Sequence, residues 1–325
     1  MEKSLKVTVV IPNYNGMKYI KLCLDSILNQ TYRDYSVLVI DNASTDGSDK
    51  FIEDNYDNVE LVRMKKNYGF SSAVNKGIEL SDSEYVLLLN NDTQTEPDFL
   101  AELVKEIEKS EDIFAVSGKM INFAKRDIMD DAGDCYTLMG WGYQRGLGKK
   151  IDNYDKSMEV FSACAGAAIY RKSVFEKIGM FDENHFAYME DIDICYRARI
   201  FGYKNRYCAD AIVYHVGSGT SGSRHNKFKV RLAARNNIYI IYKNMPFLQF
   251  MVNFPFIVAG IITKYIYFRK LDMGKSYREG FFEGLKTCYK LKKVEYDPSN
   301  KKNYFDIEKE ILKGTAIFVK EKIEK

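Results

Sequence analysis

Short runs of apolar residues alternate with polar, turn-rich stretches up to about residue 111. The runs at 7–11, 35–40, 59–63 and 85–89 have the length of β-strands, and the last has the continuous hydrophobicity of a strand buried on both faces. The segments at 19–28, 48–55 and 72–80 are predicted to be helices. This alternation predicts an α/β fold with a mainly parallel, doubly wound sheet.

The pattern is less regular between residues 113 and 215. Strands are predicted at 115–117 and 167–170, and a helix is predicted at 192–201. Between them, the glycine-rich segment 140–148 has the composition of a loop or of irregular strands. Loops of this kind over an active site often contact a second substrate.

Beyond residue 224 the chain becomes strongly apolar and then basic. The stretch 247–262 is interrupted by Asn253 and Pro255, so it falls short of a clean membrane span. Between residues 264 and 293, nine Lys and Arg residues stand against three Asp and Glu. Apolar helices beside a basic surface suit the face of an anionic bilayer, and the alternative is a helical cap on the catalytic domain.

Overall composition excludes several classes of protein. The net charge of +3 over 325 residues is too small to indicate nucleic-acid binding. The six cysteines show no C-x-x-C spacing, so they indicate buried thiols in a reducing compartment. The N-terminus leads at once into the strand at 7–11, which is too short for a signal-peptide core, so the catalytic part is expected to be cytoplasmic.

Two acidic groups carry the candidate chemistry. Asp92 follows the apolar run 85–89 directly after Asn90 and Asn91, at the strand end where α/β sheets bind ligands. A carboxylate there can hold a divalent cation against a phosphate. Glu190 and Asp191 form a second acidic pair. Together these groups predict one site that binds a nucleotide diphosphate and deprotonates a neighbouring group.

Further polar loops leave the same edge of the predicted sheet. Asp41 follows the second strand, where its carboxylate can accept the N3–H of uracil or thymine, or act as a turn or helix-capping residue. The loop 65–70 places lysines and Gly69 before a helix, which suits a phosphate but also an ordinary loop-to-helix transition.

A family resemblance joins these motifs. The segments VVIPNYN (9–15), VIDNASTDG (39–47), NYGF (67–70), LLNNDT (88–93), GMFDE (179–183) and YMEDIDICYR (188–197) resemble family 2 of the inverting glycosyltransferases. Within that family the chain is most similar to the bacterial rhamnosyltransferase-like branch. The resemblance covers residues 7–215, and the C-terminal third matches only in general character.

The resemblance implies a GT-A fold, which is a doubly wound mixed sheet, here with a C-terminal helical extension. It implies a catalytic domain at 1–223, with a nucleotide-binding half at 1–112 and an acceptor half at 113–223, followed by a helical region at 224–325. It also implies a nucleotide-diphosphate sugar donor and a divalent metal, Mn²⁺ or Mg²⁺.

The resemblance further implies roles for individual residues. Asp92 would bind the metal together with His215. Asn90 stands where the family's D-x-D motif has its first aspartate, so one carboxylate is missing from the usual pair. The implied contacts with the nucleotide are Pro12, Asn15, Asp41, Asn67, Gly69, Asn75, Asn90 and Asn91.

On the acceptor side, Asp191 matches the family's general base, which deprotonates the acceptor hydroxyl as it attacks the sugar. Glu190 would bind the acceptor or orient the loop, and the two could exchange roles or simply cap the following helix. Arg224 and Arg235 are candidates for supporting charge at the leaving diphosphate. Gly166 and Trp141 are expected to shape the acceptor pocket, although Trp141 could equally be a core residue.

These inferences lead to one main reading of the chain and two alternatives. The main reading is a membrane-associated, cytoplasmic, inverting glycosyltransferase that adds a sugar from dTDP-rhamnose or a UDP-sugar to a cell-envelope glycan, including a lipid-linked one. The first alternative is a member that binds nucleotide sugar, or a partner enzyme, without catalysis. A nucleotidyltransferase would need a glycine- and arginine-rich loop after the first strand, which the segment 12–15 is not. A homodimer stays open.

Overall fold

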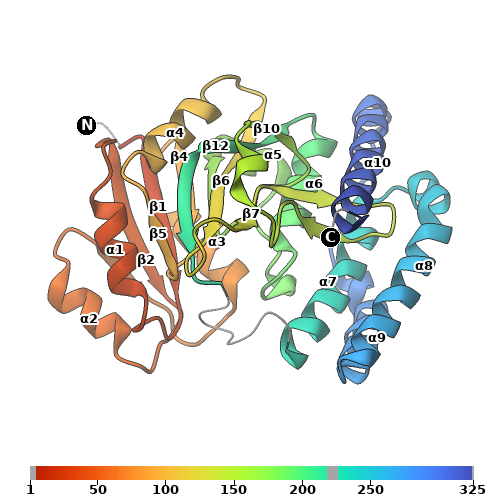
Figure 1. The fold of residues 1–325 in the computed structure, drawn as a ribbon, viewed down its shortest axis with the longest axis horizontal. Coiled ribbons are helices and arrows are strands. Elements are labelled where there is room, and N and C mark those ends of the chain that lie inside the picture. Colours follow the sequence, from red (N-terminus) through yellow and green to blue (C-terminus); the bar gives the residue numbers. More distant parts are fainter. Residues whose placement is uncertain (1–4, 218–225, 324–325) are drawn as a thin grey trace.

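A mixed β-sheet forms the centre of the computed structural model, which describes residues 5–217 and 226–323 (Figure 1). The strands of this sheet are β1 (Val7–Asn13), β2 (Tyr35–Asp41), β3 (Glu60–Arg63), β4 (Tyr85–Leu89), β5 (Thr93–Thr95), β6 (Ile113–Asn122), β7 (Met129–Asp131), β10 (Met158–Val160), β11 (Ala167–Arg171) and β12 (Lys204–His215). Their order is β10-β12-β6-β11-β4-β1-β2-β3, with β5 beside β12 and β7 beside β6.

The first four strands are parallel, as the alternation of strands and helices predicts, and β11 runs antiparallel between β4 and β6. The sheet is therefore mixed, which confirms the expected fold class. In the register of β1 and β2, Asn13 lies opposite Asp41. The polar residues that end these strands are thus neighbours at one edge.

Helices cover both faces of the sheet because inward positions on the strands alternate between two apolar cores. The helices of this part are α1 (Ile20–Leu28), α2 (Ser48–Asn55), α3 (Phe70–Leu80), α4 (Phe99–Ile107), α5 (Lys172–Ile178) and α6 (Glu190–Ile200). Val9 packs with α1 and α4, whereas Val10 packs with α3. This two-sided cover confirms the doubly wound arrangement.

Most of the predicted elements are present, and the differences lie in short or irregular segments. The helix predicted at 72–80 begins earlier, at Phe70, and the strand predicted at 115–117 extends over the whole of β6. The glycine-rich segment holds the short strand β9 (Gly142–Gln144), which pairs with β8 (Asp134–Tyr136). All six cysteines are free thiols, and four of them are buried.

Four long helices gather at one end of the molecule, opposite α1 and α2 (Figure 1). They are α7 (Lys227–Asn244), α8 (Phe247–Lys270), α9 (Gly274–Thr287) and α10 (Lys301–Ile323). The helix α8 is longer than the apolar stretch in the sequence indicates, and by length and composition it could cross a membrane. The expected boundary between residues 223 and 224, and Arg224, lie outside the described residues, so the domain division stays a prediction.

A buried ion cluster joins α7 to α6. The carboxylate of Asp193 is fully buried and accepts hydrogen bonds from Arg197 (3.0 Å), Lys243 (2.9 Å) and Asn244 (2.9 Å). Lys243 also contacts Asp182 at 2.6 Å. Burial would raise the pKa of Asp193, but Lys243 and Arg197 outweigh burial and hold it far below its usual range.

The helix α7 also supports the loop that leads into α6. In this loop Phe186, Tyr188 and Met189 have positive φ angles, which side-chain-bearing residues rarely adopt. The Asn236 side chain, on α7, donates hydrogen bonds of 2.7–3.0 Å to three carbonyl oxygens of the loop, those of His185, Ala187 and Tyr188. The backbone just before Glu190 is therefore held in place by the C-terminal helices.

Replacing Lys243 with Met keeps the length of the side chain but removes the ammonium group shared by Asp193 and Asp182. Because a buried charge is then left undercompensated, we expect the free energy of unfolding to fall by about 3–5 kcal/mol in denaturant titrations. The same substitution at exposed Lys50 serves as the control, with an expected change within about 0.5 kcal/mol. Equal losses at the two positions would contradict a special role for the cluster.

Candidate active site

Hydrogen bonds join the polar side chains at the carboxyl ends of β1 and β2. The side-chain amide of Asn13 donates to Asp41 (2.9 Å) and Ser48 (2.9 Å), and its side-chain oxygen accepts from Asn91 at 2.8 Å. The second carboxylate oxygen of Asp41 accepts from the backbone N–H of Ser44 at 3.0 Å. Asp41 is therefore buried and oriented, with acceptor capacity remaining on its carboxylate.

Pro12 and Asn15 lie next to these residues in the chain, on either side of Asn13. Asn15 has a positive φ of 51°, and its side-chain oxygen accepts the backbone N–H of Thr45 at 2.8 Å. Pro12 is half-buried in β1, directly before Asn13. The two predicted nucleotide residues on the first loop thus come close to the loop that follows Asp41.

The loop before α3 meets the loop before α6. Asn67 accepts from the Gly69 N–H (2.9 Å) and from the Asn42 amide (3.1 Å). Gly69 has a φ of +92°, and a Cβ there would lie 2.5 Å from the carbonyl oxygen of Phe186. Only glycine fits this position, because both the conformation and the close approach exclude a side chain.

Asn75 has a structural role that the sequence did not indicate. Its amide donates to the carbonyl oxygen of Phe181 (2.8 Å) and to Glu183 (3.2 Å), and its own oxygen accepts from the Phe181 N–H (3.0 Å). The side chain therefore ties α3 to the segment before α6. Its expected contact with ribose or diphosphate stays a prediction.

Asn90 lies at the exit of β4 against Gly166. The backbone N–H of Asn90 donates to the carbonyl oxygen of Gly166 at 2.8 Å, and a Cβ on Gly166 would lie 3.0 Å from the Asn90 amide nitrogen. Gly166 thus leaves room for the side chain that stands at the first position of the D-x-D-like motif.

Asp92 and His215 come together although 123 residues separate them, because β5 pairs with the end of β12. The imidazole Nε2 of His215 lies 3.3 Å from Asp92 Oδ1, and its Nδ1 lies 2.6 Å from Asp130 Oδ2. Burial lowers the pKa of His215, but the hydrogen bonds and charges of Asp130 and Asp92 outweigh burial and raise it to about 10.

This arrangement fits a divalent cation. A carboxylate oxygen and an imidazole nitrogen converge, and a second carboxylate orients the ring from its other nitrogen, as is usual behind a metal-bound histidine. A cation would take the place of the proton that the two carboxylates now favour. Sequence reasoning missed Asp130, whose signal was its place in the acidic run Asp130, Asp131 and Asp134.

Glu190 and Asp191 begin α6 in a buried setting. Burial raises the pKa of Asp191, although backbone hydrogen bonds from Ile192 and Ala165 oppose the shift. Burial and the charge of Asp191 raise the pKa of Glu190 well above its usual value. Within residues 5–217 and 226–323, Glu190 Oε2 is buried without a hydrogen-bond partner. A raised pKa increases the proton affinity of both carboxyl groups, which suits a general base.

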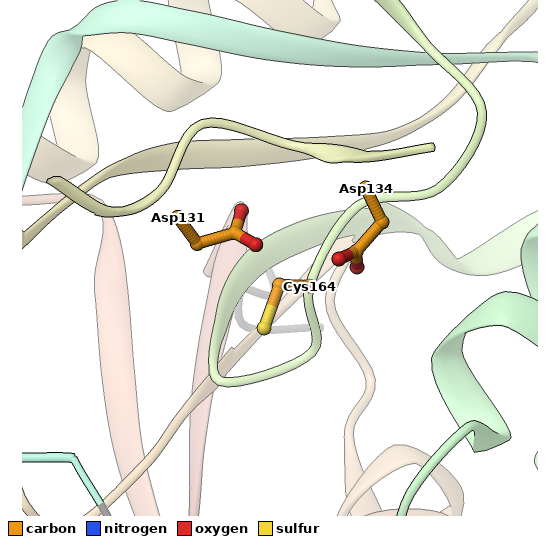
Figure 2. Close-up of side chains that lie close together, drawn as sticks. All are labelled: Asp131, Asp134 and Cys164. Atoms are coloured by element: carbon orange, nitrogen blue, oxygen red, sulfur yellow. The ribbon is translucent and has the colours of Figure 1, made fainter. Parts of the chain in front are cut away.

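Asp131, Asp134 and Cys164 form a further cluster, in which the two carboxyl groups turn toward each other beside the thiol (Figure 2). Burial and the charges of Asp130 and Asp191 raise the pKa of Asp131 to about 7. Burial and the charges of Asp131 and Asp191 raise that of Asp134. Strand β7 thus connects two groups of acids, because Asp130 contacts His215 while the charge of Asp191 acts on Asp131.

Trp141 and Arg235 make contacts with other parts of the chain. Trp141 is 9% exposed, packs edge-to-face on Phe318 at 5.6 Å and carries the Lys264 ammonium over its ring at 5.1 Å. This favours the core alternative for Trp141, and its contact with an acceptor stays a prediction. Arg235 binds Glu283 and the carbonyl oxygens of Asn184 and His185, so it supports the loop before α6.

Comparison with known proteins agrees with this geometry. The pattern of glycosyl transferase family 2 matches residues 8–179, more than half of the chain. The chain is 34% identical over 181 residues to the glycosyltransferase GlyA of Streptococcus pneumoniae, which covers 53% of this chain and 25% of that protein. It is 27% identical over 237 residues to an N-acetylglucosaminyl-diphospho-decaprenol L-rhamnosyltransferase of Mycobacterium tuberculosis, covering 66% and 77% of the two chains. The chain thus spans only a quarter of the length of GlyA.

Solved structures show the same fold at low sequence identity. GalNAc-T7 with UDP, GalNAc and Mn²⁺ aligns with a TM-score of 0.59 at 18% identity, over 74% of this chain and 48% of that one. The mannosyltransferase PcManGT from Pyrobaculum calidifontis with GDP-Man and Mn²⁺ aligns with a TM-score of 0.56 at 17% identity, over 86% and 87%. Together with the family match, these similarities show that the chain belongs to glycosyl transferase family 2 and is a glycosyltransferase with a GT-A fold.

Proposed function

We propose that this glycosyltransferase moves a sugar from a nucleotide-diphosphate donor to a hydroxyl of a cell-envelope glycan, with inversion and with Asp191 as the general base. The observation that carries the proposal is the position of β7 between two groups of acids. Asp130 supports the pair Asp92 and His215, while Asp131 interacts with Asp191. Strand β7 thus links the proposed site for the donor phosphates to the proposed proton acceptor.

The proposed donor is dTDP-rhamnose or, as the other candidate, a UDP-sugar. Thymine in the first donor and uracil in the second both carry an N3–H group. The remaining acceptor sites of the buried Asp41 carboxylate can bind this group. The similarity to an L-rhamnosyltransferase supports the first donor. A structural neighbour, the Staphylococcus aureus protein TarS, was solved with UDP-GlcNAc (TM-score 0.54, 15% identity). This neighbour is the reason to test the second candidate donor, a UDP-sugar.

The proposed metal ligands are Asp92 and His215, with Asp130 orienting the imidazole. When bound, a divalent cation neutralises charge on the leaving diphosphate, which lowers the barrier by several kcal/mol. An imidazole ligand favours Mn²⁺ over Mg²⁺, because Mg²⁺ prefers oxygen ligands. Asn90, at the missing carboxylate of the D-x-D motif, can hydrogen-bond a ribose hydroxyl but brings no charge.

In the proposed reaction, Asp191 accepts the proton of the acceptor hydroxyl as its oxygen attacks the anomeric carbon of the sugar. Its burial gives the carboxylate the raised proton affinity that this step needs. Glu190, whose Oε2 lacks a partner in the described part of the chain, is placed to hydrogen-bond the acceptor or to exchange roles with Asp191.

A non-catalytic role in binding nucleotide sugar is the alternative function. Its supporting observation is Asn90, which removes one of the two carboxylates that the family's motif provides. The two functions differ in turnover and not in donor binding, so the experiments below measure the two quantities separately.

Donor binding should depend on the metal and on Asp92. We expect isothermal titration to show one of dTDP-rhamnose, UDP-glucose, UDP-galactose and UDP-N-acetylglucosamine binding in the presence of Mn²⁺ and not after chelation. Asp92→Ala should weaken this binding by roughly 10–100-fold or more. Asp210→Ala, at an exposed carboxylate of the strand that holds His215, is the matched control and should change little. Unchanged binding in Asp92→Ala would place the metal elsewhere, with Asp131 and Asp134 as the next variants.

Turnover should depend on Asp191 without a matching loss of donor affinity. We expect Asp191→Asn to lower kcat by about 10²–10⁴-fold, because an amide cannot accept the proton. Release of nucleoside diphosphate is measured with membranes that supply the acceptor, and titration of the donor controls for folding. A larger loss in Glu190→Gln than in Asp191→Asn would exchange the two roles. No turnover in the native chain, with donor binding intact, would favour the non-catalytic function.

A further inference from the structure

The helix α8 buries polar side chains and exposes apolar ones, which is the reverse of a helix on the surface of a water-soluble domain. Its buried line consists of Gln249, Asn253, Ile257 and Gly260, at helical spacing. The amides of Gln249 and Asn253 both donate to Glu308 on α10, at 2.9 and 3.0 Å. The polar side of α8 is therefore turned inward and held there.

The opposite side of α8 exposes large apolar side chains. Phe247 and Leu248 are each 76% exposed, and Val252 is 58% exposed. The remaining exposed apolar residues of this helix are Met251, Phe254, Phe256, Val258, Ile262, Ile266 and Tyr267. An apolar face of this extent on a soluble protein marks a surface that something else covers.

Basic residues lie at the C-terminal end of this apolar face and along the neighbouring helix. α9 packs beside α8 (Figure 1) and adds the exposed Phe282 and Leu285. Exposed cations follow α8 and continue along and beyond α9: Arg269, Lys270, Lys275, Arg278, Lys286, Lys290, Lys292 and Lys293. Between residues 264 and 293 they outnumber acidic residues by nine to three when Lys264 is included. We call the exposed sides of α8 and α9 the α8–α9 surface.

We propose that the α8–α9 surface docks on an anionic lipid bilayer, with α8 lying in the interface. The apolar side chains would enter the acyl boundary while the lysines and arginines meet lipid phosphates, each adding attraction. A second copy of the chain fits less well, since two-fold pairing would bring like-charged surfaces together. A crossing of the bilayer by α8 is disfavoured, because Gln249, Asn253 and the Glu308 carboxylate would enter the hydrocarbon.

Docking would also bring the bilayer close to the glycine-rich segment that holds Trp141. Gly260 of α8 packs so closely on the segment around Trp141 that a Cβ there would lie 2.7 Å from the carbonyl oxygen of Met139. An apolar groove also lies between Leu138 and α10, and its other lining residues are Leu312, Thr315, Ala316, Val319, Lys320 and Ile323. The inference goes beyond the proposed function and does not depend on it, since it rests on the surface alone.

Co-sedimentation of the full chain with lipid vesicles tests the proposal. We expect binding to vesicles of phosphatidylcholine with phosphatidylglycerol, weaker binding as salt rises, and little binding to phosphatidylcholine alone. Lys275→Glu and Arg278→Glu should each weaken binding by at least about fivefold, and Leu248→Glu with Val252→Glu should weaken it by at least about tenfold. Lys50→Glu and Leu80→Glu, at exposed positions far from the surface, are the matched controls.

The outcomes separate this inference from the proposed function. Surface variants that lose vesicle binding while they keep donor binding support docking, whichever donor is found. Equal sedimentation with and without vesicles, or equal binding to both lipid compositions, overturns the proposal. A dimer in solution that is lost in the double variant Leu248→Glu with Val252→Glu overturns it in favour of a second copy.

Discussion

The buried carboxylate of Asp193 is the group on which the catalytic end of the molecule depends. It is 0% exposed, and a charge in that position destabilises a fold by several kcal/mol unless cations neutralise it. Arg197 comes from the same helix and Lys243 from α7. Arg197 also donates to three carbonyl oxygens at the end of α5 and directly after it, those of Ile178, Gly179 and Met180. The cations that neutralise Asp193 therefore hold three parts of the chain together: α6, the end of α5 and α7.

The contrast between Asp193 and Asp191 shows how position decides chemistry. The two carboxylates lie two residues apart in the first turn of α6, where Asp193 is fully buried and Asp191 is half-buried. Asp193 has two cations within hydrogen-bond distance, and its pKa lies far below the usual range. The charge of Asp191 raises the pKa values of Asp131 and Asp134, and burial raises the pKa of Asp191 itself. Carboxylates with opposite environments are a common source of acid and base roles in enzymes.

The sequence predicts the parts of this fold that depend on local patterns. Local sequence patterns encode the four apolar strands, the polar loops at their carboxyl ends and the acidic start of α6. Each pattern lies within a few residues of the element that it predicts. Strand β7 has no such pattern, because three residues are too few for any periodicity, so the contact between Asp130 and His215 appears only in three dimensions. The inward turn of α8 was equally hidden, since it depends on Glu308, more than fifty residues away in the chain. Asn13 was missed because its role is to connect Asp41 with Asn91, from two other strand ends.

The C-terminal helices therefore support the candidate active site and also form a candidate membrane surface. Near the start of α7, burial lowers the pKa of Lys229 and the charge of Asp92 opposes that shift, so this end of the helix lies near the proposed metal ligands. Further along, Asn236 holds the loop before Glu190, and Lys243 neutralises Asp193. Removing the chain after about residue 235 would thus expose a buried charge at the same time as it removes α8. Because truncation would damage the site and the surface together, only substitutions on the outer side of α8 and α9 can separate docking from transfer.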